Sequence, residues 1–557
     1  MAEIIKEAGY LWKKKCFAVG IPLMMFLSYC TLLFHPTIGI DDTSFKLYYV
    51  DGVSPAMGRW CLYLINKILP LDYNPVFVEA VGLLCFCISV SLWCVVFYRL
   101  FGETVSPLGY TIFGCVMLSS PIISEVVVWY LQDGIYLGYG VTALAVLFAM
   151  DVFRTDKGIS LKKRLGKLLA SAFFLTVALG FYEAFMIVFM MGVVMVFLVI
   201  RVTECRKYSK KPLEWFLNMG IVVACAMVFR TVVIQSVIAF YQLEDQTKVL
   251  ASRNAGDILQ GLLGWFDGTK EVSFSYMLKD FFVKYVCNAV VYVPVAILVL
   301  AAGVLVLWGI LKTIRKKDGW IFLSVLGILI LPLILPVLEG VATYYRSSEY
   351  VPLLTAFSVL LLIWEIRKIP VKAVRTAGFL LALLLLYRQG YEMNRWLYVD
   401  AMKYENDKLV MSSVALDIIR QCDETKPVCV IGSYQTPESL IEDVYCPTWS
   451  RRYDLVKFLV EAVDPKLFEK YDTPLGYAAA ETPRLSYINW GAVAYYGFDR
   501  ELVKFWKMHG FTFTEDGNLD HYRAAESMMQ DGPVWPKEGS IVEMEDHIIV
   551  NFGNLKQ

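Results

Sequence analysis

Long uncharged apolar segments constrain this chain more than any other feature of its sequence. Residues 291–311, for example, contain no charged side chain. A helix needs about 20 such residues to cross the hydrocarbon core of a bilayer. Across the 557 residues, 57% are hydrophobic and 19% are charged, whereas soluble domains average about 45–50% apolar and about 25% charged residues. The chain is therefore expected to be an integral membrane protein that crosses the bilayer many times.

Apolar length predicts about eleven spans. They are residues 16–35, 76–98, 107–124, 135–152, 168–181, 184–200, 216–237, 285–311, 319–337, 350–366 and 375–391. The fifth and sixth form one apolar run with Gly180 and Glu183 in its middle, which favours a tight helical hairpin and leaves a re-entrant pair open. The first follows a basic N-terminus without a small-residue cleavage site, so it is interpreted as a retained span.

Lysine and arginine cluster in alternate connections between these predicted spans. The clusters lie at the N-terminus and in residues 153–167, 201–211, 312–317 and 367–375. Because cytoplasmic loops carry an excess of Lys and Arg, these connections are predicted to face the cytoplasm. The N-terminus is then cytoplasmic, and an odd number of spans places the C-terminus outside the cytoplasm.

The composition changes near residue 393. Residues 1–392 are predicted to form a transmembrane domain and residues 393–557 a small extracytoplasmic α/β domain. In this polar tail, Val428–Gly432 and Ile548–Phe552 are short apolar runs, and Leu455–Val463 has a helical pattern. The predicted fold class is therefore mainly α, a polytopic helical membrane protein with a mixed domain at its end.

Several classes of function find no support in the sequence. The net charge is zero, so no nucleic-acid partner is expected. The 13 cysteines lie mostly in apolar segments, and no Cys-x-x-Cys pair occurs, so neither a disulfide framework nor a zinc site is predicted. The 4 histidines lack ligand spacing. No metal site and no cofactor are expected, although a metal requirement stays open.

The first loop outside the predicted cytoplasm carries the most informative charges. Asp41 and Asp42 follow the first span directly, and Arg59 lies within a stretch, 54–69, in which Trp60, Leu64 and Ile68 recur at helical spacing. That spacing predicts an amphipathic helix on the membrane surface. A carboxylate there is suited to removing a proton from a hydroxyl, and an arginine to holding a phosphate. The structural alternative is that the aspartates cap a helix or hydrate a loop.

The same loop resembles the Gtr-type family of bacterial membrane glucosyltransferases, which has a GT-C-like architecture. That family has an Asp-Asp pair after its first span and a Gly-Arg pair that opens an amphipathic helix. Here these are Asp41-Asp42 and Gly58-Arg59. The resemblance covers roughly residues 16–390.

Two further matches are less specific. A Pro, an acidic residue and an aromatic stretch ending in Asp resemble Pro121, Glu125, Trp129-Tyr130 and Asp133 here. The family's aromatic–Gln pair in a tight external turn is similar to Tyr182-Glu183, with Glu in place of Gln. The family's Arg near Asp133 is absent, because Gln132 stands there. That departure bears on substrate identity more than on reaction class.

The resemblance implies transfer of a hexose, expected to be glucose, from a polyprenyl-phosphate sugar to a cell-surface glycan at the outer face of the membrane. The expected partners are the lipid-linked donor, the glycan acceptor and membrane lipids, with a polyprenyl-phosphate glucose synthase and a flippase in the same pathway. The donor needs no nucleotide-binding fold, and neither Gly-x-Gly-x-x-Gly nor a Gly-Lys-Ser/Thr loop occurs.

Other ionisable residues are candidates for substrate binding. Glu125 and Asp133 are expected to orient the acceptor, or to solvate helix ends. Arg230 lies inside an apolar span, where an arginine is costly and is a functional hypothesis by default; pairing with a neighbouring helix is the alternative. Arg346 is a candidate for phosphate or sugar contact, or for an ion pair with Glu349.

Two other classes of function are compatible with a polytopic protein whose charges lie at the outer face. A transporter or flippase of lipid-linked glycans often shows internal repeats and Gly/Pro-broken helices near the midplane, and no repeat is evident here. A glycan polymerase or ligase usually relies on a large external loop rich in arginine, whereas residues 238–284 contain only Arg253. Both observations favour the transferase.

Overall fold

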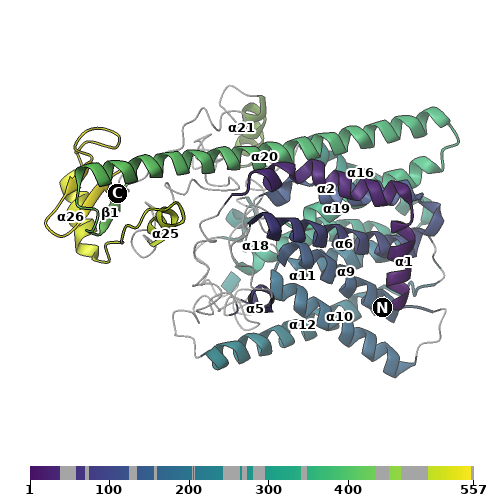
Figure 1. Ribbon diagram of the computed structural model, residues 1–557. Helices are drawn as coiled ribbons and strands as arrows, with labels where there is room; N and C mark the ends of the chain where they lie inside the picture. Colours follow the sequence, from purple (N-terminus) through teal and green to yellow (C-terminus); the bar gives the residue numbers. More distant parts are fainter. Residues whose placement is uncertain are drawn as a thin grey trace.

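The computed structural model describes the protein as a helical bundle joined by one long helix to a small mixed unit (Figure 1). The described residues are 1–37, 55, 58–68, 75–124, 134–155, 160–203, 205, 207–241, 264–265, 273–279, 281, 295–339, 348–432, 451–465 and 500–553.

The helices of the bundle follow the order of the predicted spans. They are α1 (Ala2–Trp12), α2 (Lys15–Phe34), α5 (Trp60–Ile68), α6 (Pro75–Phe101), α7 (Pro107–Leu118), α9 (Gly134–Val152), α10 (Leu161–Phe181), α11 (Phe185–Thr203), α12 (Pro212–Tyr241), α16 (Val295–Lys316), α17 (Gly319–Ile330), α18 (Ile334–Glu339), α19 (Tyr350–Arg367) and α20 (Lys372–Gln421). Short 3₁₀ turns extend α6, α7 and α17 at Gly102–Thr104, Pro121–Ile123 and Leu331–Leu333.

Each predicted span coincides with helix in the described part of the chain, which confirms a polytopic helical protein. Among those residues, 8 helical stretches are long and apolar enough to cross a membrane. The other three predicted spans correspond to the shorter apolar stretch Pro107–Ile123, to α16, which is preceded by residues outside the described set, and to the first part of α20. The fifth and sixth spans are α10 and α11, joined by the short turn at residues 182–184, so the tight hairpin is confirmed.

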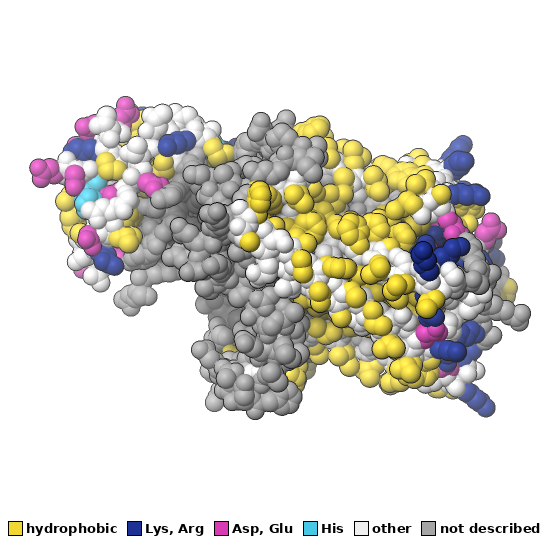
Figure 2. All heavy atoms as spheres, turned by 90° about the horizontal axis from the view of Figure 1, so that it is seen from below, with side chains coloured by type: hydrophobic (Ala, Val, Ile, Leu, Met, Phe, Trp, Pro, Cys, Tyr) yellow, Lys and Arg dark blue, Asp and Glu magenta, His cyan; other side chains and the backbone are white. Residues whose placement is uncertain are grey.

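Helix α11 forms the centre of the bundle. Its residues from Phe185 to Ile200 are all buried, and it contacts α6, α9, α17 and α19. A helix that is apolar all round is stable only where neighbours surround it. The surrounding helices therefore carry the lipid-facing surface, which Figure 2 shows as a broad zone of hydrophobic side chains.

Lysine and arginine gather at one end of the bundle, the end where α1 lies (Figures 1 and 2). Ion pairs tie the helices together there. Arg99 pairs with Glu7 at 2.8 Å and with Asp151 at 3.1 Å, while Lys167 reaches the second oxygen of Asp151 at 2.8 Å. Burial raises the pKa of the Glu7 carboxyl, and the Arg99 guanidinium opposes that rise. Helix α1, which the sequence analysis did not predict, packs on α6 through this network.

Helix α20 connects the bundle to the tail without a break. At 50 residues it is about 75 Å long, far more than a bilayer span requires. Buried positions recur along one face, and this stripe joins the core of the bundle as far as Val399 and the core of the tail from Tyr404 onward. The predicted boundary at residues 392/393 falls within this helix, and the division into two domains stays a prediction.

The described tail contains a three-stranded sheet with the order β1-β3-β2. Strand β1 (Val428–Ile431) runs parallel to β3 (Ile548–Asn551), with Val428 opposite Ile548, and β2 (Ile541–Glu543) runs antiparallel to β3. Both predicted apolar runs are therefore strands. The helices α21 (Arg451–Val463), α25 (Arg500–Met508) and α26 (Leu519–Met529) complete the tail, and α21 contains the predicted helical pattern.

The ion-pair network at the basic end leads to a test of stability. The Arg99 side chain is 4% exposed, and breaking a buried pair by removing one partner typically costs roughly 3–5 kcal/mol. We expect Arg99→Ala to destabilise the bundle by that order and to raise the pKa of Glu7 further. Thermal unfolding of the purified protein in detergent measures the first effect. The control is Arg375→Ala, an exposed arginine near the start of α20 whose side chain, among the described residues, hydrogen-bonds the Pro370 carbonyl oxygen. Equal losses in both variants would contradict the assignment.

Candidate functional site

Helix α5 lies at the end of the bundle opposite the basic end. It is seen nearly end-on in Figure 1, whereas the spanning helices run across the view, so it lies crosswise to them. It packs on α10. Cys61, Leu62 and Tyr63 are buried, and Leu64 is 45% exposed. A helix within the predicted stretch is confirmed, whereas its place on the membrane surface stays a prediction. The residues that face the bundle are Cys61 and its neighbours, because they pack on α10.

Two glycines allow this close packing. A side-chain carbon added at Gly180 of α10 would lie 2.6 Å from the Trp60 ring and 2.7 Å from the Cys61 sulfur. At Gly134, the first residue of α9, it would clash with Leu62. The thiol of Cys61 also donates to the Val177 carbonyl oxygen at 3.4 Å. The contact of α5 with α10 therefore depends on the missing side chain of Gly180, and its contact with the start of α9 on that of Gly134.

Arg230 of α12 lies at the same position along the bundle as the contact between α5 and α10. Helices α10 and α12 are parallel and in a constant register, since Arg164 pairs with Glu214 at 2.5 Å and Thr176 Oγ1 donates to the Ala226 carbonyl oxygen at 3.3 Å. In each pair, the two residues are 50 positions apart in the sequence. The same offset places Arg230 beside Gly180, at the end of α10, while α12 continues to Tyr241.

The backbone just before α5 meets the Arg230 side chain. Gly58 has φ +87°, a conformation that other residues adopt only with strain, and a side-chain carbon there would clash with the guanidinium of Arg230. Arg230 is only 3% exposed. Gly58 therefore serves two purposes: it turns the chain into α5 and leaves room for a buried cation.

Arg59 contacts Tyr182, which ends α10. The Arg59 guanidinium carbon lies 5.0 Å from the centre of the Tyr182 ring, within the range of a cation–π interaction. Tyr182 is 4% exposed, and its backbone N–H still donates to the Ala178 carbonyl oxygen at 3.1 Å. Arg59 and Arg230 are thus brought to the same end of the bundle by the backbone of one glycine, Gly58.

The structure therefore brings together three of the predicted site residues: Arg59, Tyr182 and Arg230. Glu183 is half-buried in the turn beside Tyr182. The other predicted site residues lie outside the described residues: Asp41, Asp42, Glu125, Asp133 and Arg346. Thr37, which precedes the aspartates, is held by a 2.8 Å hydrogen bond from its hydroxyl to Asp400 of α20.

Buried carboxylates are the feature of this site that the sequence analysis used least. Glu79, in the first turns of α6, is 3% exposed, and Glu349, just before α19, is 1% exposed. The backbone oxygen of Glu349 accepts a 2.8 Å hydrogen bond from Tyr139. An acidic residue at the edge of an apolar segment is a signal in itself, and by that rule Glu79 was open to detection from the sequence.

The chemical character of the site follows from these contacts. Two guanidinium groups, an aromatic ring and an apolar surround provide a setting for an anion, because Arg binds phosphate with directed donors in a low-dielectric environment. Carboxylates close to the same end provide acceptors for a proton. No metal-binding group lies among the described residues of this end of the bundle; the one that the described residues offer is Asp516, His521 and His547, in the tail.

Comparison with known families agrees with the resemblance seen in the sequence. The family model described as Glucosyl transferase GtrII matches residues 30–363, well over half of the 557 residues. The match contains α5, Tyr182 and Arg230 and leaves out the tail. No curated protein and no solved structure matches the chain.

The glycine contacts lead to a test in which one helix supplies its own control. Gly180→Ala pushes a methyl group against Trp60 and Cys61, and overpacking of this kind typically costs roughly 1–3 kcal/mol. Gly166→Ala, on the same helix with nothing within 4 Å, is expected to be neutral or to stabilise by about 0.5–1 kcal/mol. Thermal unfolding of the two variants measures the difference. Equal behaviour would mean that α5 does not pack on α10 as described.

Proposed function

The chain belongs to the glucosyl transferase GtrII family, and on that premise we propose that it transfers a hexose, most simply glucose, from a polyprenyl-phosphate sugar to a cell-surface glycan. One observation carries the proposal: Arg59, packed on Tyr182, and Arg230, packed on the backbone at Gly58, lie at the same end of the bundle, beside a helix that lies crosswise to the spans. A lipid-linked donor presents its phosphate at that depth. Charge-assisted bonds from guanidinium groups are the strongest recognition of such an anion.

The proposed reaction is a single displacement with inversion at the sugar. An acceptor hydroxyl oxygen attacks C1 of the hexose as the bond from C1 to the phosphate oxygen breaks. The bonding electrons leave with the polyprenyl phosphate, and a carboxylate takes the hydroxyl proton. Asp41 or Asp42 is proposed as this base, on the family resemblance. Arg59 and Arg230 stabilise the phosphate as its negative charge grows.

The remaining predicted residues are proposed to bind substrates. Tyr182 orients Arg59 through their ring contact, and Glu183 lies next to it in the α10–α11 turn. Glu125, Asp133 and Arg346 are proposed to contact the acceptor or the sugar. Gly134, which follows Asp133 in the chain, lies against Leu62 of α5.

We propose that the reaction takes place on the outer face of the cell membrane. The basic clusters lie at the end of the bundle with α1, and the site lies at the opposite end, which supports a cytoplasmic N-terminus under the positive-inside rule. The tail, residues 393–557, is then extracytoplasmic, and we propose that it orders the acceptor or a partner. A synthase and a flippase that provide the lipid-linked sugar are the implied pathway partners.

The two aspartates give the first test of this mechanism. Adjacent residues point in different directions, so only one is expected to act as the base. One of Asp41→Asn and Asp42→Asn should lose turnover by roughly 10²–10⁴-fold while still binding the lipid donor, and the other should lose less. Arg59→Ala should instead weaken donor binding. The measurements are sugar transfer and donor affinity at matched membrane levels, with Gly166→Ala as the control. Near-normal transfer by both Asn variants would refute the mechanism.

Cysteine labelling tests the orientation. Cys205 follows α11 at the basic end, and Cys422 ends α20 in the tail; both are half-buried. In variants in which Cys422 or Cys205 is the single remaining cysteine, an impermeant reagent should label Cys422 in intact cells and Cys205 only after lysis. Because burial raises the pKa of the Cys422 thiol, labelling is followed to completion. The reverse pattern would place the site on the cytoplasmic side.

A further inference from the structure

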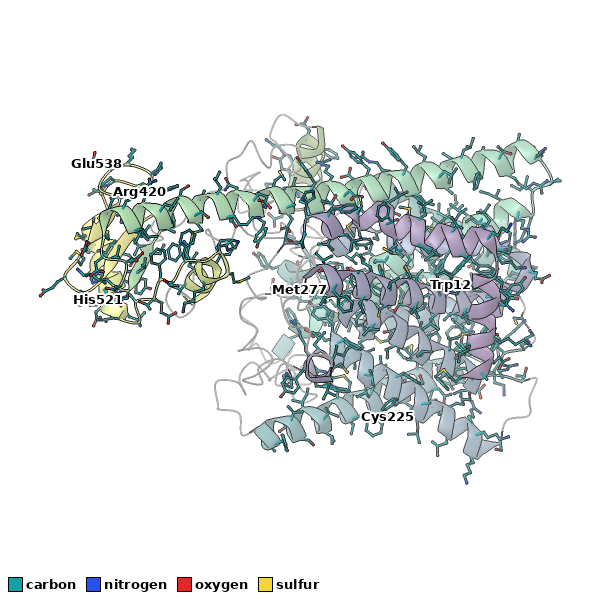
Figure 3. All side chains as sticks on the ribbon, viewed as in Figure 1. Trp12, Cys225, Met277, Arg420, His521 and Glu538 are labelled. Carbon is teal, nitrogen blue, oxygen red and sulfur yellow. The ribbon has the colours of Figure 1, made fainter. Side chains whose placement is uncertain are left out.

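Two histidines and two aspartates converge in the tail, far from the site described above. Figure 3 shows His521 at the end of the molecule distant from the bundle. His521 belongs to the first turn of α26, and His547 directly precedes β3. Asp516 precedes α26, and Asp546 lies between β2 and β3. The cluster thus joins one helix to the start of the central strand of the sheet.

The rings and carboxylates of this cluster lie in direct contact. The two imidazole rings are parallel, with centroids 4.2 Å apart and planes 9° apart. Asp516 Oδ2 lies 2.7 Å from His521 Nδ1. Asp546 bridges both rings, with Oδ1 2.7 Å from His547 Nδ1 and Oδ2 3.4 Å from His521 Nε2.

Burial distinguishes the cluster from an ordinary surface ion pair. His547 is 6% exposed and Asp516 is 3% exposed, while the Asp546 side chain is 65% exposed. Asp516 is also fixed by its other oxygen, which accepts the backbone N–H of Asn518 at 3.0 Å. Two buried or half-buried rings and a positioned carboxylate therefore form a preorganised set, with the exposed Asp546 at its solvent side.

We propose that this cluster binds a single divalent transition-metal ion, with Zn²⁺ as the best fit. One possible ligand atom from each of Asp516, His521 and His547 lies within 4.8 Å of the others. Zinc bonds to imidazole nitrogen and carboxylate oxygen at about 2.0–2.2 Å, which separates neighbouring ligand atoms in a tetrahedron by about 3.3 Å. Small rotations of the half-buried His521 and of the exposed Asp546 would bring the ligand atoms to that separation.

The donor set selects the class of ion. Calcium and magnesium take oxygen ligands almost throughout, and copper(I) prefers thiolate or thioether ligands. Two imidazoles with carboxylates suit zinc. Asp546 is placed to complete the tetrahedron, which would close the site and make it structural, since a catalytic zinc keeps an open position. The ion would then hold the first turn of α26, through His521, against the start of β3, through His547. This site lies outside residues 30–363, which the family model matches.

The experiment uses the full-length protein, purified in detergent and stripped of metal with a chelator. Titration with Zn²⁺ followed by metal analysis should show one ion per chain that His521→Gln and His547→Gln each remove. His509→Gln is the matched control, because His509 is a half-buried histidine of the same unit whose Nδ1 contacts only the Phe505 carbonyl oxygen in the described structure. Its binding should equal that of the unaltered chain.

A second readout separates metal binding from folding and from binding to thiols. Zn²⁺ should raise the unfolding temperature of the tail in the unaltered chain, a chelator should reverse the rise, and Mg²⁺ should not produce it. The two glutamine variants should unfold at the temperature of the metal-free chain and not respond to Zn²⁺. Co²⁺ in place of Zn²⁺ should give visible absorption without a thiolate band. Zinc binding that survives both glutamine variants, or no binding by the unaltered chain, would overturn the proposal.

Discussion

Backbone groups inside a bilayer find no water to bond with, and this constraint shapes the whole chain. Each spanning segment must satisfy its own N–H and C=O groups, so each becomes a helix. Polar side chains are then confined to the ends of the bundle or to contacts between helices. Arg99, Glu7 and Asp151 pair at one end, and Arg59 and Arg230 gather at the other. Such an end tolerates charge, and a cationic site such as that of Arg59 and Arg230 can form there.

The cost of burying Arg230 explains the local design at the site. An arginine within a span is expensive unless it lies near the interface or meets a partner. The register of α10 and α12 places Arg230 level with Gly180, where α10 is about to end and α5 crosses. Gly58 lets the backbone approach the guanidinium directly. Gly180 and Gly58 therefore set how closely α5, and the backbone just before it, can lie on the ends of α10 and α12.

The sequence predicted helices well and contacts poorly, for a physical reason. Apolar length is a local property, so the spans and the α10–α11 hairpin could be located from composition alone. The contact of Gly58 with Arg230 joins residues far apart in the chain, and no single-sequence pattern carries that information. The same holds for His521 and His547, whose spacing suggests no metal site until α26 and β3 bring them together. Glu79 is different, because an acidic residue at the edge of an apolar segment is a local signal that the sequence itself carries.

The buried side chains on one face of helix α20 belong to two hydrophobic cores, that of the bundle and that of the tail. Its buried positions recur every three or four residues from Leu386 to Ile418, first against α2 and then against the tail. Asn394 still bonds to Thr31 of α2 at 2.9 Å, and from there to Gln421 the helix rises about 40 Å. A flexible linker of the same length would let the tail vary its distance and orientation relative to the bundle. A continuous helix instead holds the tail at a set distance from the bundle, because its buried face packs in both cores without a break.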